Sequence, residues 1–323
     1  MKKYLLILIC LLLSLCFTGC ERQAPYTRSG FALDTFITIT VYDTDKAHAQ
    51  AVLDEAFDKC LYYDRLFNIS DPSGDIYRLN HANGAKTAVS EETYELLQLA
   101  VSYAGISGGL LDVTIQPVYA LWDFTNTETP SLPEPSSIED ALKSVDYHNI
   151  RFEGNGEISL TDQAGVNPGA IAKGYIADRL KELLISKNIT SAMINLGGNV
   201  QTIGTKPGDR PFVIGLQKPF DENGAILTEV SVSDRSVVTS GIYQRCFTID
   251  GKIYHHILDP NTGYPADNGL NAAVIIADSS VEADALSTIC MLMSKEDAMA
   301  FLKTRENVQA IFIDHANHFT AWP

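Results

Sequence analysis

Segments with helix periodicity and segments with strand periodicity follow one another irregularly along this 323-residue chain. Apolar residues at helical spacing predict helices over 46–66, 91–107, 170–187, 280–293 and 295–303. Runs rich in β-branched residues predict strands over 31–42, 157–160, 192–196, 212–216, 229–232, 237–239, 244–249, 254–258 and 272–277. Neighbouring strands are hairpin-like, and the regular strand–helix–strand spacing of a parallel sheet is missing. The pattern therefore predicts an α+β fold, a single compact domain of mixed sheets and helices, rather than a Rossmann-type fold.

Charge excludes one broad class of partner. The chain carries 24 Lys and Arg against 40 Asp and Glu, a formal net charge of −16, while 46% of its residues are hydrophobic. The apolar content is sufficient for a substantial core. An acidic protein has no general electrostatic attraction to nucleic acid or anionic lipid, so we expect no nucleic-acid partner and only local binding of any phosphate.

The N-terminus has the order of residues found in a secretory signal. Lys2 and Lys3 precede an apolar run over 5–16, and the small residues Thr18 and Gly19 stand before Cys20. This ending is similar to a lipobox, which predicts a signal peptide over 1–19, a lipid on Cys20 and a polar tether over 20–30. The folded domain would then occupy 31–323. A plain secretory signal and an uncleaved anchor are the alternatives.

The cysteines outside this segment give no framework for disulfides or zinc. Cys60, Cys246 and Cys290 are odd in number and lack CxxC spacing. Cys60 and Cys290 fall in apolar patterns, where a buried thiol acts as a small hydrophobic residue.

The segment NPGAIAKGYIADR over 167–179 is the most specific of the candidate functional segments. Its Pro-Gly turn leads into a helix, whose first N–H groups attract phosphate, and Lys173 adds a full positive charge one turn later. Taken alone, the segment is equally well explained as a capped helix with a surface lysine.

A second segment, EADALST over 282–288, places two oxygen-bearing side chains on one face of a helix. Asp284 and Thr288 are four residues apart. A carboxylate and a hydroxyl form part of a site for Mg²⁺, which keeps waters and binds substrate phosphate oxygens. A solvated Asp and a Thr bonded back to its own helix are the alternative.

Two further segments suit the close approach of a ligand. In 237–265, Ser240 and Gly241 end a β-branched strand, and a hairpin at Asp250 leads to a strand in which His255 and His256 point to opposite faces. Only one histidine can therefore face a site, and its near-neutral pKa would suit proton transfer, although a structural histidine is the alternative. In NLGGN over 195–199 the paired glycines allow a close backbone approach or form an ordinary tight turn.

Together these segments resemble the ApbE family of flavin transferases, which move FMN from FAD onto a protein. The resemblance covers most of the chain after the signal and keeps the order of eight blocks. They are FALDTFITITVY, FNISDPSGDIYRLN, GGLLDVTIQPVYALWDF, NPGAIAKGY, INLGGN, TSGIYQR, HHILDPNTGYP and ADALST. The family's fold is a single α+β catalytic body, which implies a flavin transferase catalytic domain over 31–323.

The resemblance implies a role for individual residues. Mg²⁺ would be bound by the backbone carbonyl of Ala170 and by the side chains of Asp284 and Thr288, and His256 would transfer a proton. The implied FAD-binding positions are Leu33, Ser70, Leu110, Leu111, Asp112, Asn167, Lys173, Gly198, Ser240, Gly241 and Ile257. Leu33 stands where the family commonly has methionine, which is a mild apolar exchange. Asn167 stands where aspartate is frequent, so the resemblance does not establish one hydrogen bond to the cofactor.

The implied reaction is Mg²⁺-dependent transfer of FMN from FAD to a threonine hydroxyl of an acceptor flavoprotein, with AMP released. Water as the nucleophile would instead make the protein an FAD pyrophosphatase, and a flavin-binding lipoprotein without activity is the third alternative. The implied location is the extracytoplasmic face of the cell membrane, where the lipid anchor holds the enzyme. The implied partners are FMN-binding subunits of membrane electron-transport complexes.

Overall fold

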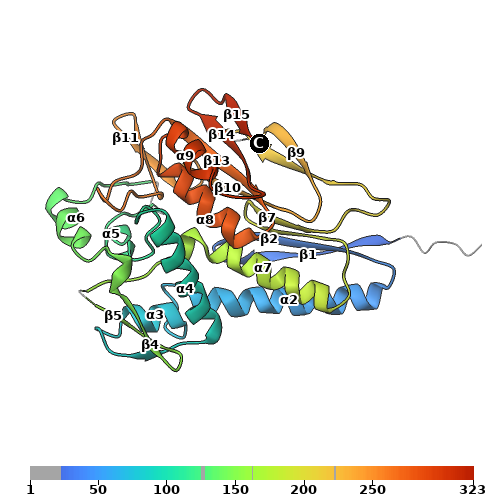
Figure 1. Ribbon diagram of the computed structural model, residues 1–323, viewed down its shortest axis with the longest axis horizontal. Coiled ribbons are helices and arrows are strands. Elements are labelled where there is room, and N and C mark those ends of the chain that lie inside the picture. The colour runs from blue at the N-terminus through green and yellow to red at the C-terminus, as the bar shows by residue number, and fades with distance from the viewer. Residues whose placement is uncertain (1–22, 125–127, 162, 222) are drawn as a thin grey trace, which may run out of the picture.

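The structure is a computed structural model that describes residues 23–124, 128–161, 163–221 and 223–323. The predicted signal peptide and Cys20 lie outside these residues. Eight of the described strands form one antiparallel sheet in the order β1-β2-β6-β7-β10-β13-β14-β15 (Figure 1). Their bounds are β1 Ala24–Ala32, β2 Thr35–Asp43, β6 Ala192–Leu196, β7 Asn199–Ile203, β10 Ser236–Gly241, β13 Leu270–Ala277, β14 Gln309–Asp314 and β15 Phe319–Trp322.

Three helices cover one face of this sheet. They are α2 Lys46–Phe67, α7 Ala172–Ser186 and α8 Ser280–Met291, and they lie side by side, with α7 in the middle (Figure 1). Their apolar faces and the facing strand residues form the main core, which includes Ile37, Ile39, Leu180 and Leu286. Burial of these side chains is the main force that holds the helices on the sheet.

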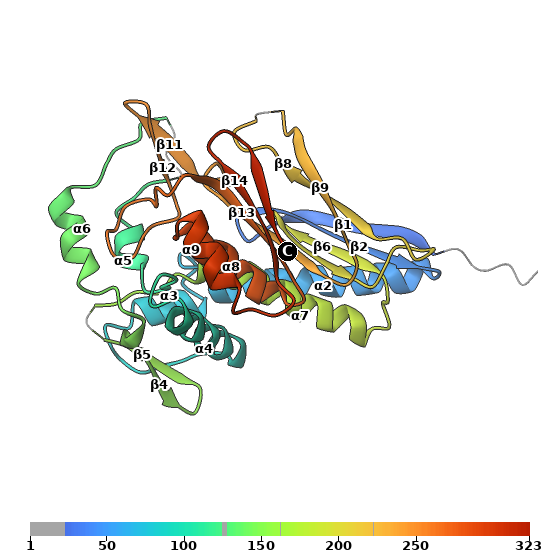
Figure 2. The same ribbon diagram turned by 45° about the horizontal axis from the view of Figure 1, so that its top comes forward.

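A β-hairpin covers part of the opposite face. It consists of β8 Phe212–Gln217 and β9 Ile226–Val232, and its buried residues Phe212, Ile214 and Leu216 form a second apolar cluster with β10, β13 and β14 (Figure 2). Because β13 has cover on both faces, all eight of its residues are buried. This burial explains its continuous apolar sequence.

The remaining elements form a smaller region beside the end of the sheet (Figure 1). It contains α3 Asp75–Asn80, β3 Thr87–Ala88, α4 Glu91–Ile106, α5 Gln116–Tyr119, α6 Pro135–Leu142, η1 Tyr147–Asn149, β4 Ile150–Gly154, β5 Glu157–Leu160, η2 Pro168–Ala170, β11 Cys246–Ile249 and β12 Lys252–His255. Helix α9, Lys295–Leu302, follows α8. The rings of Trp122, Phe124 and Phe247 pack together here and attach the β11–β12 hairpin to α5 and α6.

The predicted α+β class and the five predicted helices are confirmed, with bounds that differ by a few residues. The start of the chain was predicted wrongly. The expected strand over 31–42 is a hairpin, because the chain turns at Leu33 and Asp34, whose φ angles are 56° and 53°. Residues 24–30, expected to belong to the tether, form most of β1. This edge strand covers the core with one face only, and every second residue is exposed. Its sequence is therefore as polar as that of a linker, which is why the strand was not recognised.

Other differences concern short elements. The strand expected over 254–258 ends at His255, and α6, which was not predicted, begins at Pro135 in its first turn. Strands β7, β14 and β15 were not predicted. Cys60 and Cys290 are fully buried, as expected, and burial raises the pKa of each thiol to about 12.

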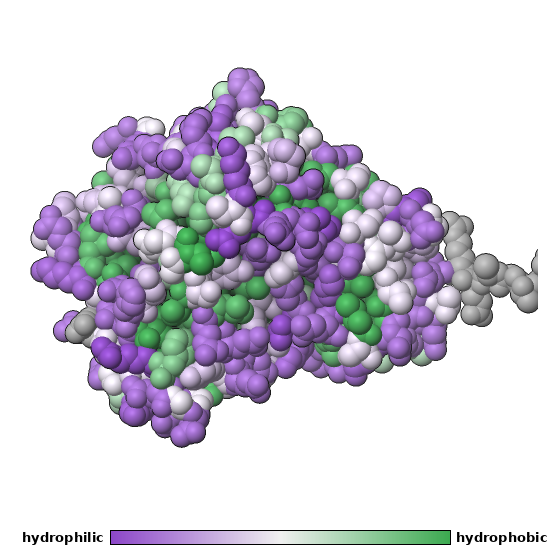
Figure 3. Space-filling model, viewed as in Figure 1, coloured by the Kyte–Doolittle hydropathy of each residue, from purple (hydrophilic) through white to green (hydrophobic). Residues whose placement is uncertain are grey.

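The surface agrees with the acidic composition. The face shown in Figure 3 is largely hydrophilic, and its apolar residues form separate small patches. Within the described residues, no helix has both the length and the apolar composition needed to cross a bilayer.

Candidate active site

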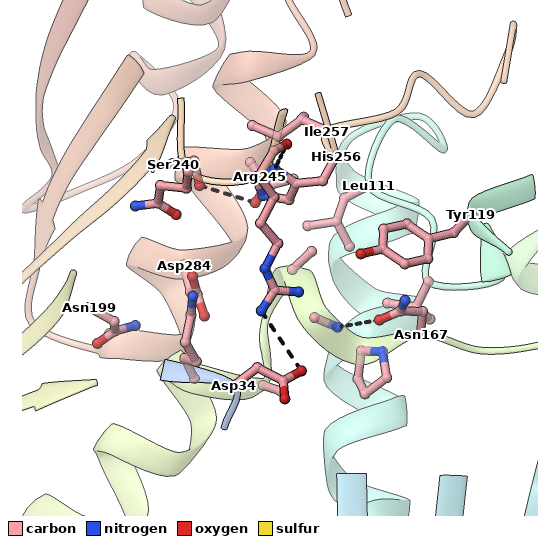
Figure 4. Close-up of a pocket in the computed structure, with 18 of the residues that line it drawn as sticks. Asp34, Leu111, Tyr119, Asn167, Asn199, Ser240, Arg245, His256, Ile257 and Asp284 are labelled. Carbon is pink, nitrogen blue, oxygen red and sulfur yellow. Dashed lines mark hydrogen bonds and ion pairs between the residues drawn. The ribbon is translucent and has the colours of Figure 1, made fainter. Parts of the chain in front are cut away.

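A cavity of about 610 Å³ lies where the sheet, the helix layer and the smaller region meet (Figure 4). Its wall combines the β1–β2 turn, the segment 110–115, the start of α7, the 197–199 turn, the end of β10, the segment 256–260 and one face of α8. These segments come from distant parts of the sequence. The volume is typical of a site for a small molecule or cofactor.

Most of the residues predicted from the sequence line this cavity. They are Leu33, Leu110, Leu111, Asp112, Asn167, Ala170, Lys173, Ser240, His256, Ile257, Asp284 and Thr288. Ser70, Gly198 and Gly241 are not among the lining residues, although their neighbours Ile69, Gly197 and Ser240 are. The structure thus brings twelve of the fifteen predicted binding, metal and catalytic residues together, and their roles as ligands remain predictions.

Asp284 is placed by a close contact between α7 and α8. Its carboxylate accepts a hydrogen bond of 2.7 Å from the backbone N–H of Gly174. A Cβ atom at Gly174 would lie 2.4 Å from the Ser280 carbonyl oxygen and 2.6 Å from the Val281 Cα. Only glycine therefore allows the two helices to approach closely enough for this hydrogen bond.

A second carboxylate joins the same two helices, but here the acceptor belongs to α7 and the donors lie at the start of α8. Asp178 of α7 accepts hydrogen bonds from Ser279 Oγ at 2.8 Å, from the Ser280 N–H at 2.8 Å and from the Val281 N–H at 3.0 Å. It therefore satisfies free donors at the N-terminus of α8, where the helix dipole also favours a negative charge. Together, Asp178 and Asp284 hold the position and rotation of α8 relative to α7.

The predicted magnesium ligands fit a hard cation. Asp284 is 4% exposed, and burial raises the pKa of its carboxyl to about 6, while Lys173 and the Gly174 N–H partly oppose this shift. In a continuous helix the Gly174 N–H would donate to the Ala170 carbonyl, but it donates to Asp284 instead. Ala170, Asp284 and Thr288 all line the cavity, so their carbonyl, carboxylate and hydroxyl groups are candidate oxygen ligands.

Acidic and histidine side chains alone do not make a metal centre in this cavity. Across the residues that the structure describes, no three His, Cys, Asp or Glu side chains gather in a group that could hold an ion. The predicted set includes only one such side chain, Asp284, so any bound Mg²⁺ would complete its coordination with waters or substrate oxygens.

His256 is held in one protonation state. Burial lowers the pKa of its imidazole to about 3, and the positive charges of Arg245 and Lys173 contribute to this shift. Nδ1 lies 3.3 Å from the Arg245 carbonyl oxygen, which can only accept, so Nδ1 carries the proton and Nε2 has a free lone pair. The ring is therefore neutral at physiological pH, and its unprotonated Nε2 can accept a hydrogen bond.

The two adjacent histidines face different surroundings, as predicted. His255 is buried outside the cavity lining, and its Nε2 lies 2.9 Å from the Ala266 carbonyl oxygen. Burial lowers the pKa of His255 to about 4. His256 is therefore the histidine of this pair that lines the cavity.

The predicted FAD-binding residues Asp112 and Asn167 make hydrogen bonds within the wall. One Asp112 oxygen accepts from the Thr114 N–H and hydroxyl, and the other accepts from the Tyr147 N–H at 2.8 Å. Asn167 donates to Gln116 Oε1 at 3.0 Å and accepts from the Gly169 N–H at 3.1 Å. Both side chains hold loops that shape the cavity, and Asn167 orders the turn that carries Ala170.

The structure adds residues that sequence reasoning missed. Arg245 lies across the cavity in Figure 4, 3.8 Å from Asp34 of the β1–β2 turn, and Asn199 lies beside Asp284. Both stand in blocks that had been recognised, TSGIYQR and INLGGN. Attention to charged and amide side chains, rather than to hydroxyls and glycines alone, could have found them.

Comparison with known proteins gives a consistent result. The model of the ApbE family matches residues 33–312. A protein of Klebsiella pneumoniae named FAD:protein FMN transferase is 33% identical over 291 residues, which is 89% of each chain. A protein of Treponema pallidum with the same name is 31% identical over 325 residues, covering 95% of this chain and 90% of its own. A crystal structure of an ApbE protein from Thermotoga maritima has a TM-score of 0.86 at 30% identity, covering 93% of this chain and 97% of its own.

Proposed function

Because this chain belongs to the ApbE family, we propose that it is an FAD:protein FMN transferase that moves FMN from FAD onto a threonine hydroxyl of an acceptor protein. The observation that carries the proposal is the convergence of Lys173, His256, Asp284 and Thr288 on one cavity. This set can bind a diphosphate, neutralise its charge and remove a proton from a hydroxyl, which are the three tasks of the reaction.

The proposed step is a displacement at the phosphorus of the FMN half of FAD. The threonine oxygen forms the new O–P bond, and the bond between this phosphorus and the bridging oxygen breaks. The products are an FMN phosphoester on the acceptor and AMP. The hydroxyl proton passes to Nε2 of His256, which is unprotonated because Nδ1 carries the ring proton.

Mg²⁺ fits the proposal because the oxygen donors of Ala170, Asp284 and Thr288 line the cavity with Lys173. When bound there, Mg²⁺ would supply charge neutralisation on the diphosphate. Lys173 contributes a further positive charge in the same cavity, and the neighbouring turn and helix start supply backbone N–H groups. The hydrogen bond from the Gly174 N–H holds Asp284 in position.

One incubation separates this function from its alternatives. The protein is mixed with FAD, Mg²⁺ and an FMN-accepting flavoprotein, and the products are resolved on a denaturing gel and by chromatography. Fluorescent acceptor together with AMP supports the transferase. Free FMN and AMP without labelled acceptor would indicate a pyrophosphatase, and intact FAD would indicate a flavin-binding protein.

We also propose that the enzyme works at the extracytoplasmic face of the cell membrane, attached through a lipid on Cys20. Support comes from the order of charged, apolar and small residues over 1–20. Strand β1 begins at Ala24, so only a short segment would separate the lipid from the folded domain. FMN-binding subunits of membrane electron-transport complexes are the acceptors that this location favours. Globomycin treatment, which blocks removal of lipoprotein signals, should leave a longer precursor, and a Cys20→Ser variant should lose the lipid.

A further inference from the structure

Asn199 carries a buried side-chain donor that makes no hydrogen bond of normal geometry within the described residues. The side chain is 1% exposed and lies at the start of β7, in the wall of the cavity. Its Nδ2 has no hydrogen-bond partner among the described residues. An unpaired buried donor carries a desolvation cost, so its persistence in a cavity wall points to a partner that enters from the cavity.

The orientation of the Asn199 amide is determined by its other end. Oδ1 accepts a hydrogen bond of 2.8 Å from Ser280 Oγ, and this hydroxyl lies 3.0 Å from Ser236 Oγ. Because Oδ1 is engaged with α8, Nδ2 projects from the opposite side of the amide. In Figure 4 this nitrogen points toward the region beside Asp284.

The surroundings of Nδ2 indicate the chemistry of the missing partner. A weak side-chain interaction with Asn199 favours the ionised form of Asp284, but Nδ2 lies outside normal hydrogen-bond geometry with that carboxylate and keeps capacity for a further acceptor. Lys173 lines the same part of the wall and interacts electrostatically with Asp284. A site with an amide donor and an ammonium group suits an anion with several acceptor oxygens.

We propose that Asn199 Nδ2 donates a hydrogen bond to a diphosphate oxygen of the dinucleotide substrate. The inference deepens the proposed function and rests on it, since FAD supplies the diphosphate. Asn199 then acts together with Lys173 on the phosphate part of the substrate, while the flavin and adenine contact other parts of the cavity.

Equilibrium binding tests this role without relying on turnover. FAD, ADP and riboflavin are titrated in Mg²⁺-free buffer against the wild type and the Asn199→Ala variant. FAD and ADP carry the diphosphate, whereas riboflavin carries only the flavin. We expect Asn199→Ala to weaken FAD and ADP binding by about 10- to 100-fold, the equivalent of one hydrogen bond to a charged group, and to leave riboflavin binding unchanged.

Asn271→Ala is the matched control. Asn271 is also buried, at 4% exposure, and its amide donates to Asn317 Oδ1, but it lies outside the cavity lining. This variant should lose stability without loss of affinity for FAD or ADP. If Asn199→Ala fails to fold, Ser280→Ala removes the hydroxyl that orients the amide and should produce the same ligand pattern with a smaller loss.

Each other outcome has a distinct meaning. Equal losses for FAD and riboflavin, or no loss for any ligand, would overturn the assignment. A loss that appears only when Mg²⁺ is present would also overturn it, because Asn199 would then act through Asp284. Absence of FAD binding by the wild type would overturn the proposed function itself, and the inference with it.

Discussion

Gly174→Ala is the substitution that most directly tests how the helix layer builds the site. The added Cβ would lie 2.4 Å from the Ser280 carbonyl oxygen, 2.6 Å from the Val281 Cα and 2.7 Å from the Asp284 Cβ. Two of these three atoms belong to the backbone of α8 or its start, so rotation of a side chain cannot relieve the overlap. The helices must separate, and the hydrogen bond from the Gly174 N–H to Asp284 must lengthen or break.

The expected cost follows from these two effects. Overpacking of a close helix contact costs about 1–3 kcal/mol. Weakening a hydrogen bond to a buried carboxylate costs about 1.5–3 kcal/mol more. Alanine recovers up to about 1 kcal/mol as the better helix former. The net loss is therefore about 2–5 kcal/mol of the free energy of unfolding, which is a large part of the stability of an ordinary domain.

Urea-induced unfolding of the purified variant measures this loss, and Gly105→Ala is its control. Gly105 lies in helix α4, and a Cβ there would have no neighbour within 4 Å. The same exchange at Gly105 should be neutral or stabilising by up to about 1 kcal/mol. A Gly174→Ala protein within 1 kcal/mol of the wild type would refute the argument that glycine is needed for helix approach.

Three further substitutions address the chemistry and the pH response. Asp284→Asn keeps an acceptor for the Gly174 N–H but removes a carboxylate whose pKa burial raises to about 6. In an FMN-transfer assay its rate should fall by about 100-fold or more, since a metal ligand is lost. Its unfolding midpoint in metal-free urea should not decrease, and a rate like that of the wild type would remove Asp284 from the mechanism. His256→Gln should retain FAD affinity in a fluorescence titration but transfer FMN about 10²- to 10⁴-fold more slowly. Full activity across pH would instead make His256 structural. For His255 the folded pKa of about 4 lies below the unfolded value of 6.5, so the unfolded state binds more protons as pH falls below 6.5. This histidine alone should cost about 2 kcal/mol of stability between pH 7 and pH 5, and urea titrations at both pH values should find a smaller decrease for His255→Gln. An equal decrease in both proteins would contradict this assignment.

Local patterns were sufficient for the elements that bury a wide or continuous apolar surface. Helix α2 and the wholly buried β13 could be predicted because their core-facing residues follow the period of the element. The β1–β2 turn could not, because Leu33 is not a typical residue for a positive φ angle, although Asp34 is. Strand β7 was missed since Asn199 and Gln201 interrupt its apolar pattern, although all five of its residues are buried.

The candidate site shows the same division. Motifs could identify Lys173, His256, Asp284 and Thr288 because each has a functional group whose chemistry is evident from the residue type. Motifs could not identify the role of Gly174, which matters because α8 lies too close for a side chain at this position. They could not identify the role of Asp178 either, because it accepts hydrogen bonds from residues about 100 positions later in the chain. Nor could they indicate that the Asn199 donor lacks a partner, because satisfaction of a donor depends on every atom around it.

By itself, the sequence determined the α+β class, five of the helices, the order of the blocks that resemble the ApbE family and twelve of the residues that line the cavity. These features depend on side-chain chemistry and on periodicity within one element, and both are local. The tertiary structure alone decided how α7 and α8 present Asp284 and which buried donors remain open to a ligand. Those properties arise from burial and from contacts between segments distant in the chain, because desolvation and hydrogen bonding act on what is adjacent in space.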